Sequence, residues 1–156
     1  MKVIIISGAR NSSKTTTLKR FLSSSENKFL GYICENSDNK KKLYLRNLLD
    51  NRKINILQTD EIINSERIGR YYIIPSSFEE SRKVLLDQIE EIKDEDFIIV
   101  LDEIGALELS GSGYDDLIND LIKIDKDMII CVRDTFVEAV CEKYNFNDVE
   151  IITANK

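Results

Sequence analysis

The feature that most constrains the fold is an apolar run that leads directly into a polar loop containing glycine. Residues 2–7 are Lys-Val-Ile-Ile-Ile-Ser, and a continuous β-branched run of this kind predicts a central strand of a parallel sheet, covered on both faces. The loop begins at Gly8, and from Lys14 onward apolar residues recur at helical spacing. We therefore expect a strand, a loop and a helix in direct succession.

The loop sequence, Gly8-Ala-Arg-Asn-Ser-Ser-Lys-Thr-Thr16, is similar to the pattern G-x-x-x-x-G-K-[ST]. In that pattern backbone N–H groups hold the phosphates of a nucleotide, the lysine reaches the β- and γ-phosphate oxygens, and the next hydroxyl binds Mg²⁺. The predicted nucleotide-binding residues are Gly8, Ala9, Arg10, Asn11, Ser12, Ser13, Lys14, Thr15 and Thr16. Ser13 replaces the second glycine, and a positive φ there would cost a serine roughly 1 kcal/mol.

A second apolar strand, residues 97–101, ends in the adjacent carboxylates Asp102 and Glu103. Open α/β sheets bind their ligands at the carboxyl ends of parallel strands. There Asp102 can hold Mg²⁺ together with Thr15, and Glu103 can orient and deprotonate the water that attacks a γ-phosphate. Asp102-Glu-Ile-Gly105 is also the D-x-x-G pattern of switch GTPases, but the chain has no N-K-x-D motif to specify guanine.

The rest of the chain predicts an α/β fold in one domain, residues 1–156. Short strands separated by polar turns predict an antiparallel meander inserted over residues 29–58. A helix is expected at 77–92, where Pro75 is followed by two overlapping S-x-x-E capping boxes that begin at Ser76 and Ser77. Strands and helices then alternate, which favours parallel pairing. The expected helices are 114–124 and 135–144, and the expected strands are 128–132 and 149–152.

The order of the strands distinguishes the two interpretations of Asp102. A switch GTPase places its D-x-x-G strand beside the strand that precedes the phosphate loop. An NTPase with an added catalytic glutamate has one further parallel strand between them. We expect residues 128–132 to be that strand, and residues 149–152 to flank strand 2–7 on its other side. Arg133 would then reach the γ-phosphate, ahead of Arg10 and Arg70 as the cation that stabilises transition-state charge.

The composition excludes several classes of function. The chain carries 22 Lys and Arg against 28 Asp and Glu, a net charge of −6, so no nucleic-acid partner is expected. It contains no histidine, which excludes imidazole bases and leaves proton transfer to carboxylates. The three cysteines form no C-x-x-C pair and are expected as free thiols. No apolar stretch approaches the length of a spanning helix, so a cytoplasmic protein without a membrane partner is expected.

Three segments of the chain together resemble the THEP-type nucleoside-triphosphatases. These are the loop at 8–16, then Arg67-Ile-Gly-Arg-Tyr-Tyr-Ile-Ile-Pro-Ser-Ser-Phe-Glu79, then Asp102-Glu-Ile-Gly-Ala-Leu-Glu-Leu-Ser110. They are similar to the family's phosphate loop and to its "VGKYxVxLxSFE" and "DEIGKMELxS" segments. The resemblance implies a P-loop NTPase sandwich of three layers, in which a mostly parallel sheet places strand 2–7 beside strand 128–132. It also implies hydrolysis of ATP, GTP and other nucleotides with little base preference.

Carried over position by position, the resemblance assigns nucleotide binding to Gly8, Lys14, Thr15 and Thr16. It assigns magnesium to Asp102 and catalysis to Glu103. The chain departs from the family pattern in three places, since it has Ser13, Ala106 and Arg70 where the family has glycine, lysine and lysine. Two alternatives stay open: a nucleotide or nucleoside kinase of the same fold, and a regulatory NTP-binding module that hydrolyses weakly because of Ser13. The oligomeric state is not predicted.

Overall fold

The computed structural model describes residues 1–10 and 12–154, and in it the first apolar run forms an inner strand of the sheet. This strand, β1 (Val3–Gly8), pairs in parallel with β8 (Met128–Arg133) on one side and with β9 (Val149–Thr153) on the other. On its far side β8 pairs in parallel with β7 (Ile98–Ile104). The predicted strand order is therefore confirmed, and the arrangement of a switch GTPase is not found.

Beyond β7 the sheet continues with a strand whose partner differs from the prediction. β2 (Phe29–Asn36) pairs in parallel with β7, so the expectation that the whole of 29–58 is antiparallel is wrong for its first strand. The physical reason is burial, because Leu30–Cys34 is buried throughout, as in a strand covered on both faces. A Cβ at Gly31 would lie 1.9 Å from the carbonyl oxygen of Val100, so the two strands approach closely where this glycine stands.

The antiparallel part of the sheet lies outside β2. Within the described residues the sheet has nine strands in the order β5-β6-β4-β3-β2-β7-β8-β1-β9. The four outer strands are β3 (Lys42–Asn47), β4 (Lys53–Gln58), β6 (Tyr71–Ile73) and β5 (Arg67–Ile68). They pair antiparallel with one another and with β2. The extension therefore reaches residue 73, well past the predicted end of the insertion.

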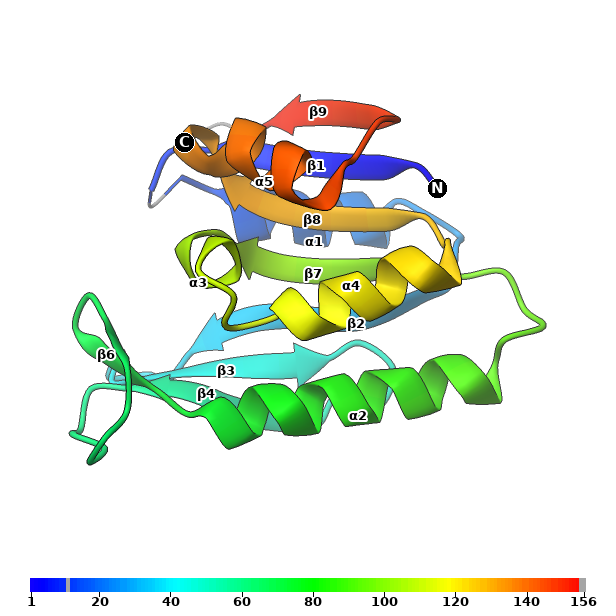
Figure 1. Ribbon diagram of the computed structural model, residues 1–156. Helices are drawn as coiled ribbons and strands as arrows, with labels where there is room; N and C mark the ends of the chain where they lie inside the picture. Colours follow the sequence, from blue (N-terminus) through cyan, green and yellow to red (C-terminus); the bar gives the residue numbers. More distant parts are fainter. Residues whose placement is uncertain (11, 155–156) are drawn as a thin grey trace.

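Helices cover both faces of the sheet, which gives the predicted three layers (Figure 1). One face is covered by α1 (Lys14–Ser23), whose Leu18 belongs to a small core with Ile6 and Ile129. The other face holds the larger core. Its helices are α2 (Pro75–Glu91), α4 (Asp115–Ile124) and α5 (Val137–Tyr144). In the described part of the chain no helix is both long and apolar enough to cross a membrane.

Several helices begin at residues that differ from the predicted ones. α2 begins at Pro75, and its N-cap, Ile74, makes no side-chain hydrogen bond, so the predicted capping boxes at Ser76 and Ser77 do not start this helix. Proline is favoured at the first helical position because the missing N–H has no partner there. The expected helix at 135–144 begins with a 3₁₀ turn, Asp134–Phe136. A short helix, α3 (Ala106–Leu109), was not predicted.

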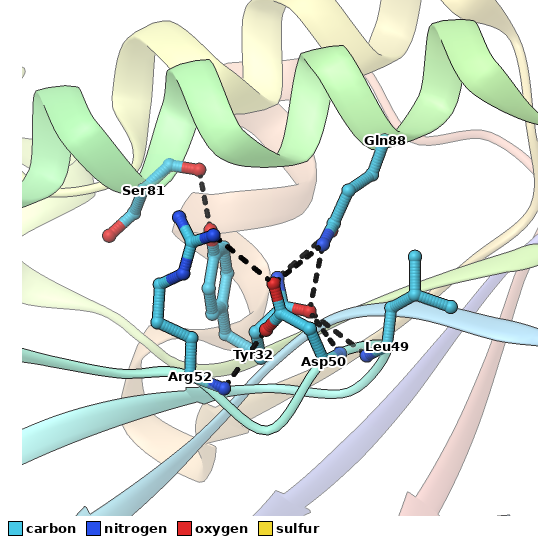
Figure 2. Close-up of polar contacts among 7 residues, drawn as sticks. Tyr32, Leu49, Asp50, Arg52, Ser81 and Gln88 are labelled. Atoms are coloured by element: carbon cyan, nitrogen blue, oxygen red, sulfur yellow. Dashed lines mark hydrogen bonds and ion pairs between the residues drawn. The ribbon is translucent and has the colours of Figure 1, made fainter.

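A buried polar network joins α2 to the turn between β3 and β4 (Figure 2). The Asn47 Nδ2 donates to Gln88 Oε1 at 2.9 Å, and Gln88 Nε2 donates back to Asn47 Oδ1 at 3.1 Å. The same Asn47 oxygen accepts the backbone N–H groups of Leu49 and Asp50 at 2.9 and 3.1 Å. The side chain of Asn47 is fully buried and hydrogen-bonded through both of its polar atoms. This network, which we call the Asn47 network, fixes the turn against the helix.

Candidate active site

The carboxyl ends of β1, β2, β7 and β8 meet at one edge of the sheet, at the left of Figure 1. A cavity of about 850 Å³ lies at this edge, the place where open α/β sheets bind ligands. Its walls include residues of the loop after β1, the end of β7, and Arg133 at the end of β8. The fold therefore brings Lys14, Thr15, Asp102, Glu103 and Arg133 to one cavity, as the sequence predicts.

The loop after β1 is closed tightly around Lys14. A Cβ at Gly8 would lie 2.3 Å from the Oγ of Ser12, so a larger residue at the first loop position would displace the Ser12 side chain. The Lys14 ammonium is buried and donates to the carbonyl oxygen of Ala9 at 2.9 Å and to Ser12 Oγ at 3.3 Å. The Lys14 ammonium is thus held by oxygen atoms of its own loop. In a complex with nucleotide, phosphate oxygens would replace these acceptors.

Ser13 is not strained. It is the N-cap of α1 and has φ −84° and ψ 44°, which lies outside the left-handed region that favours glycine. Its carbonyl oxygen accepts the N–H of Thr17 at 2.8 Å. The strain that a serine would suffer at a positive φ is therefore absent, because the backbone enters the helix with a negative φ at residue 13.

The other predicted loop residues differ in where they lie relative to the cavity. Arg10, Ser12, Lys14 and Thr15 line the cavity. Gly8, Ala9 and Ser13 contribute backbone, and Thr16 is exposed on the first turn of α1. Asn11 lies outside the described residues.

The end of β7 contains a bulge that gives both carboxylates access to the cavity. Leu101 pairs with Ile130 and Ile104 pairs with Val132, so Asp102 and Glu103 together lie opposite a single residue of β8. In a regular strand these two neighbours would point to opposite faces of the sheet. Glu103 has φ 64°, a left-handed conformation that costs a non-glycine residue free energy and that clusters at functional sites. Both side chains line the cavity as a result.

Asp102 is fully buried and only half satisfied. Its Oδ2 accepts from Thr15 Oγ1 at 2.9 Å and from the Cys34 N–H at 3.1 Å. Its Oδ1 is buried without a hydrogen-bond partner among the described residues. Burial raises the pKa of this carboxyl, against the lowering effect of the Cys34 and Thr15 hydrogen bonds. An oxygen without a partner beside a threonine hydroxyl fits a hard divalent cation such as Mg²⁺.

Glu103 lies between opposing charges. Loss of surrounding water raises its pKa from the usual value, and the neighbouring Asp102 raises it further. The cations Lys14 and Arg133 lower it. The Arg133 guanidinium lies 5.4 Å from the centre of the Phe136 ring, which also lines the cavity. A carboxylate whose pKa lies above the ordinary value is better suited to accept a proton near neutral pH than an unperturbed one.

Sequence reasoning missed two buried residues that border the cavity, Glu108 and Tyr114. Glu108 accepts the Gly105 N–H at 2.7 Å and the Tyr114 N–H at 3.0 Å, and thereby closes the turn after the two carboxylates. Burial raises its pKa to about 7. Tyr114 has a buried hydroxyl with no hydrogen-bond partner among the described residues. A glutamate three residues after Gly105 was the available signal for the first, as a cap of a short helix.

The cysteines are free thiols, as expected. Cys34 and Cys131 are buried and Cys141 is partly buried. Cys34 and Cys131 lie on β2 and β8, the strands on either side of β7. Neighbouring strands are about 4.8 Å apart, so two strands separated by a third are too distant for a disulfide.

Sequence comparison with known proteins identifies one family. The sequence pattern of a family described as NTPase matches residues 3–156. The nucleoside-triphosphatase THEP1 of Thermotoga maritima is 27% identical over 156 residues, which cover 98% of this chain and 86% of the relative. The protein of the same name from Aquifex aeolicus is 27% identical over 124 residues, covering 76% and 70% of the two chains. The resemblance found in the three sequence segments is thereby confirmed.

Solved structures agree on the fold. The crystal structure of THEP1 from Aquifex aeolicus superposes with a TM-score of 0.78 at 19% identity, covering 99% of this chain and 90% of that one. The solution structure of a human cancer-related nucleoside triphosphatase gives a TM-score of 0.74 at 17% identity, with 100% and 90% covered. Because a family pattern spans almost the whole sequence and the fold agrees, the chain belongs to the NTPase family and is an enzyme of that kind.

Proposed function

We propose that residues 1–156 act as one nucleotide-binding domain that hydrolyses nucleoside 5′-triphosphates, ATP and GTP among them, to the diphosphate and phosphate in the presence of Mg²⁺. The observation that carries this proposal is the pair formed by Thr15 and Asp102. A hydroxyl of the phosphate loop lies 2.9 Å from a buried carboxylate, one oxygen of which has no partner in the described part of the chain, as a metal-bound triphosphate requires.

Each residue has a distinct part in this proposal. Lys14 and the loop N–H groups bind the β- and γ-phosphate oxygens. Thr15 and Asp102 would hold Mg²⁺, which would supply positive charge against that of the phosphates. Glu103 takes a proton from the attacking water, which displaces the diphosphate from the γ-phosphorus. Arg133 stabilises the charge that develops on the transferring group.

Two substitutions test these roles. We expect Lys14→Ala to abolish binding of Mg-ATP, and Glu103→Gln to keep binding while turnover falls by about 10²- to 10⁴-fold. Binding is measured by calorimetry, because the chain has no tryptophan, and turnover by phosphate release from ATP, GTP, CTP and UTP. Lys83→Ala and Glu138→Gln, at exposed positions away from the cavity, are the matched controls. Undiminished hydrolysis in Glu103→Gln would contradict the assignment of the base.

A weakly hydrolysing regulatory module is less well supported. That alternative depends on strain at Ser13, and the φ of −84° gives no strain to relieve. The kinase alternative requires the cavity to hold a second substrate beside the nucleotide.

A further inference from the structure

Glu108 is a buried carboxylate to which the proposed hydrolysis gives no part. It is 2% exposed, and both of its oxygens accept backbone N–H groups. Oε1 accepts from Gly105 at 2.7 Å, and Oε2 accepts from Tyr114 at 3.0 Å. A carboxylate loses the hydration of its charge on burial, so proteins keep few such groups where an uncharged side chain would serve. The place of Glu108 at the edge of the cavity therefore indicates a role in the site.

The first N–H that Glu108 accepts lies two residues after the proposed base. Glu103 has a φ of 64°, and a non-glycine residue keeps such a backbone only where the surrounding structure holds it. Before Glu103 the chain is held by the pairing of β7 with β8. After Glu103 this pairing ends at Ile104, and the next residue, Gly105, donates to Glu108. The Glu108 carboxylate therefore holds the chain at the point where the strand no longer does.

Gly105 also lies against the wall of the cavity that carries Arg133. A Cβ at Gly105 would lie 3.2 Å from the ring of Phe136, so the backbone packs closely on this ring. The Arg133 guanidinium lies 5.4 Å from the centre of the same ring. A displacement of Gly105 would therefore affect both Glu103, two residues before it, and the ring beside Arg133.

The other contacts of Glu108 are with the helices α4 and α5. Tyr114, whose N–H Glu108 accepts, is the N-cap of α4. On α5, Lys143 donates to the main-chain oxygen of Glu108 and forms an ion pair with Asp115 of α4 at 3.0 Å. The carboxylate and the backbone of Glu108 are thus fixed to two helices of the same layer. Through its hydrogen bond, Glu108 fixes Gly105 relative to these helices.

We propose that Glu108 is a positioning residue, which holds the Gly105 N–H and thereby keeps the Glu103 carboxylate directed into the cavity, toward the attacking water. The inference rests on the function proposed above. Glu108 does not exchange a proton with the substrate, because both of its oxygens are occupied by N–H groups. It therefore acts on the rate of the chemical step and leaves nucleotide binding to Lys14 and Thr15.

Glu108→Gln tests this role without changing the size of the side chain. A glutamine offers one oxygen and one NH₂ group, so one of the two backbone N–H groups then faces a donor. The full chain is assayed with Mg-ATP at about pH 8, above the Glu108 pKa of about 7, so that the unsubstituted carboxyl is ionised. We expect kcat per folded molecule to fall by about 10- to 10²-fold, while KM stays within about twofold.

The affinity for a non-hydrolysable ATP analogue with Mg²⁺, measured by calorimetry, should also stay within about twofold. Glu142→Gln makes the same chemical change at an exposed position on α5 and should keep kcat, KM and affinity. An unchanged kcat in Glu108→Gln would overturn this inference alone. An equal loss of nucleotide affinity would mean that Glu108 supports the whole cavity, and would overturn the positioning role. Absence of hydrolysis in the unsubstituted protein would overturn the proposed function, and the inference with it.

A pair of glycine variants displaces the Glu108 carboxylate without replacing it. Gly111 and Gly113, in the loop between α3 and α4, have φ values of 87° and 60°, so alanine strains the backbone at either position. A Cβ at Gly113 would lie 2.1 Å from Glu108 Oε2, whereas a Cβ at Gly111 would have no atom of the described residues within 4 Å.

We expect Gly113→Ala to have a kcat about fivefold or more below that of Gly111→Ala, with the same KM. The folded fraction of both variants is measured by circular dichroism, and kcat is given per folded molecule. This comparison does not depend on whether Glu108→Gln folds. Equal kcat values in the two alanine variants would show that the position of the carboxylate does not matter, and would overturn the positioning role.

Discussion

Two buried polar clusters lie on the same sheet and differ in how well they are satisfied. In the Asn47 network both polar atoms of Asn47 have partners, and the cluster lies at the β3–β4 turn, away from the carboxyl edge. At Asp102 one oxygen has no partner within residues 1–10 and 12–154, the carboxyl pKa is raised by burial, and the next residue has a left-handed backbone. At the sheet edge where ligands bind, the free oxygen of Asp102 fits a bound cation, whereas the hydrogen-bonded amide of Asn47 stabilises the fold.

The largest effect on stability is expected for a substitution in the Asn47 network. Asn47→Ala removes four hydrogen bonds and leaves the Gln88 amide and two backbone N–H groups without their partners. We expect the free energy of unfolding to fall by about 3 to 4 kcal/mol, measured by urea denaturation. Phosphate release per folded molecule should stay the same. Asn119→Ala, at an exposed position on α4, is the control and should change stability by less than about 0.5 kcal/mol.

Glu108 sharpens the comparison because it is buried like Asn47 and ionisable like Asp102. Its pKa is raised from 4.5 to about 7 by burial. A raised acid pKa means that the folded state binds the proton more tightly, so the stability this group contributes is complete at low pH and is lost as the pH rises through about 7. Glu108→Gln cannot ionise. We expect the unsubstituted protein to lose up to roughly 3 kcal/mol more than this variant between about pH 5 and about pH 8.

The measurement is urea unfolding of both proteins at the two pH values. All other titrating groups are shared, so they cancel in the difference between the proteins. Parallel stability curves would mean that the N–H groups of Gly105 and Tyr114 offset the burial of the ionised Glu108.

Asp102→Asn should raise the stability of the protein, whereas Asn47→Ala lowers it. The substitution removes a fully buried charge while an amide oxygen can still accept from Thr15 and Cys34. We expect stability at neutral pH to rise by about 1 kcal/mol while Mg-dependent hydrolysis is lost. Thermal unfolding and phosphate release are measured on the same sample. A destabilised protein would show that this carboxylate supports the fold as Asn47 does.

The smallest effect is expected for Ser13→Gly. Because Ser13 has a negative φ, glycine is not needed for a left-handed backbone and adds freedom to the unfolded chain. We expect stability to fall by about 0.5 kcal/mol and nucleotide affinity to stay within twofold, measured by denaturation and calorimetry. A gain of several-fold in affinity or turnover would restore the view that the loop is strained at this position.

Much of the fold could be predicted because its inner strands are apolar on both faces. Residues 2–7, 97–101 and 128–132 each require cover on two sides, and their separation by helices requires parallel pairing. The partner of β2 could not be predicted in this way. Its apolar run is compatible with either direction of pairing, and only the register of the folded sheet, with Gly31 beside Val100, shows that β7 is a parallel neighbour.

The candidate site also contains residues that could be predicted from the sequence and residues that could not. Lys14, Thr15, Asp102 and Glu103 could be predicted because they belong to contiguous motifs at the ends of strands. The bulge that turns Glu103 toward the cavity depends on pairing with β8, which no local pattern contains. Ile56, Phe78 and Tyr114 line the cavity from segments far apart in the chain, so only the folded sheet brings them together.

The position of β1 in the sheet has a consequence for synthesis on the ribosome. Its two neighbours, β8 and β9, both come from the far end of the chain, with Val3 beside Met128 and Val149. While the intervening residues emerge, the apolar β1 has neither partner, and the phosphate loop has no fixed position relative to Asp102. With the site proposed above, a chain whose translation has not passed β8 cannot cleave nucleotide, and the apolar β1 needs protection from aggregation during elongation.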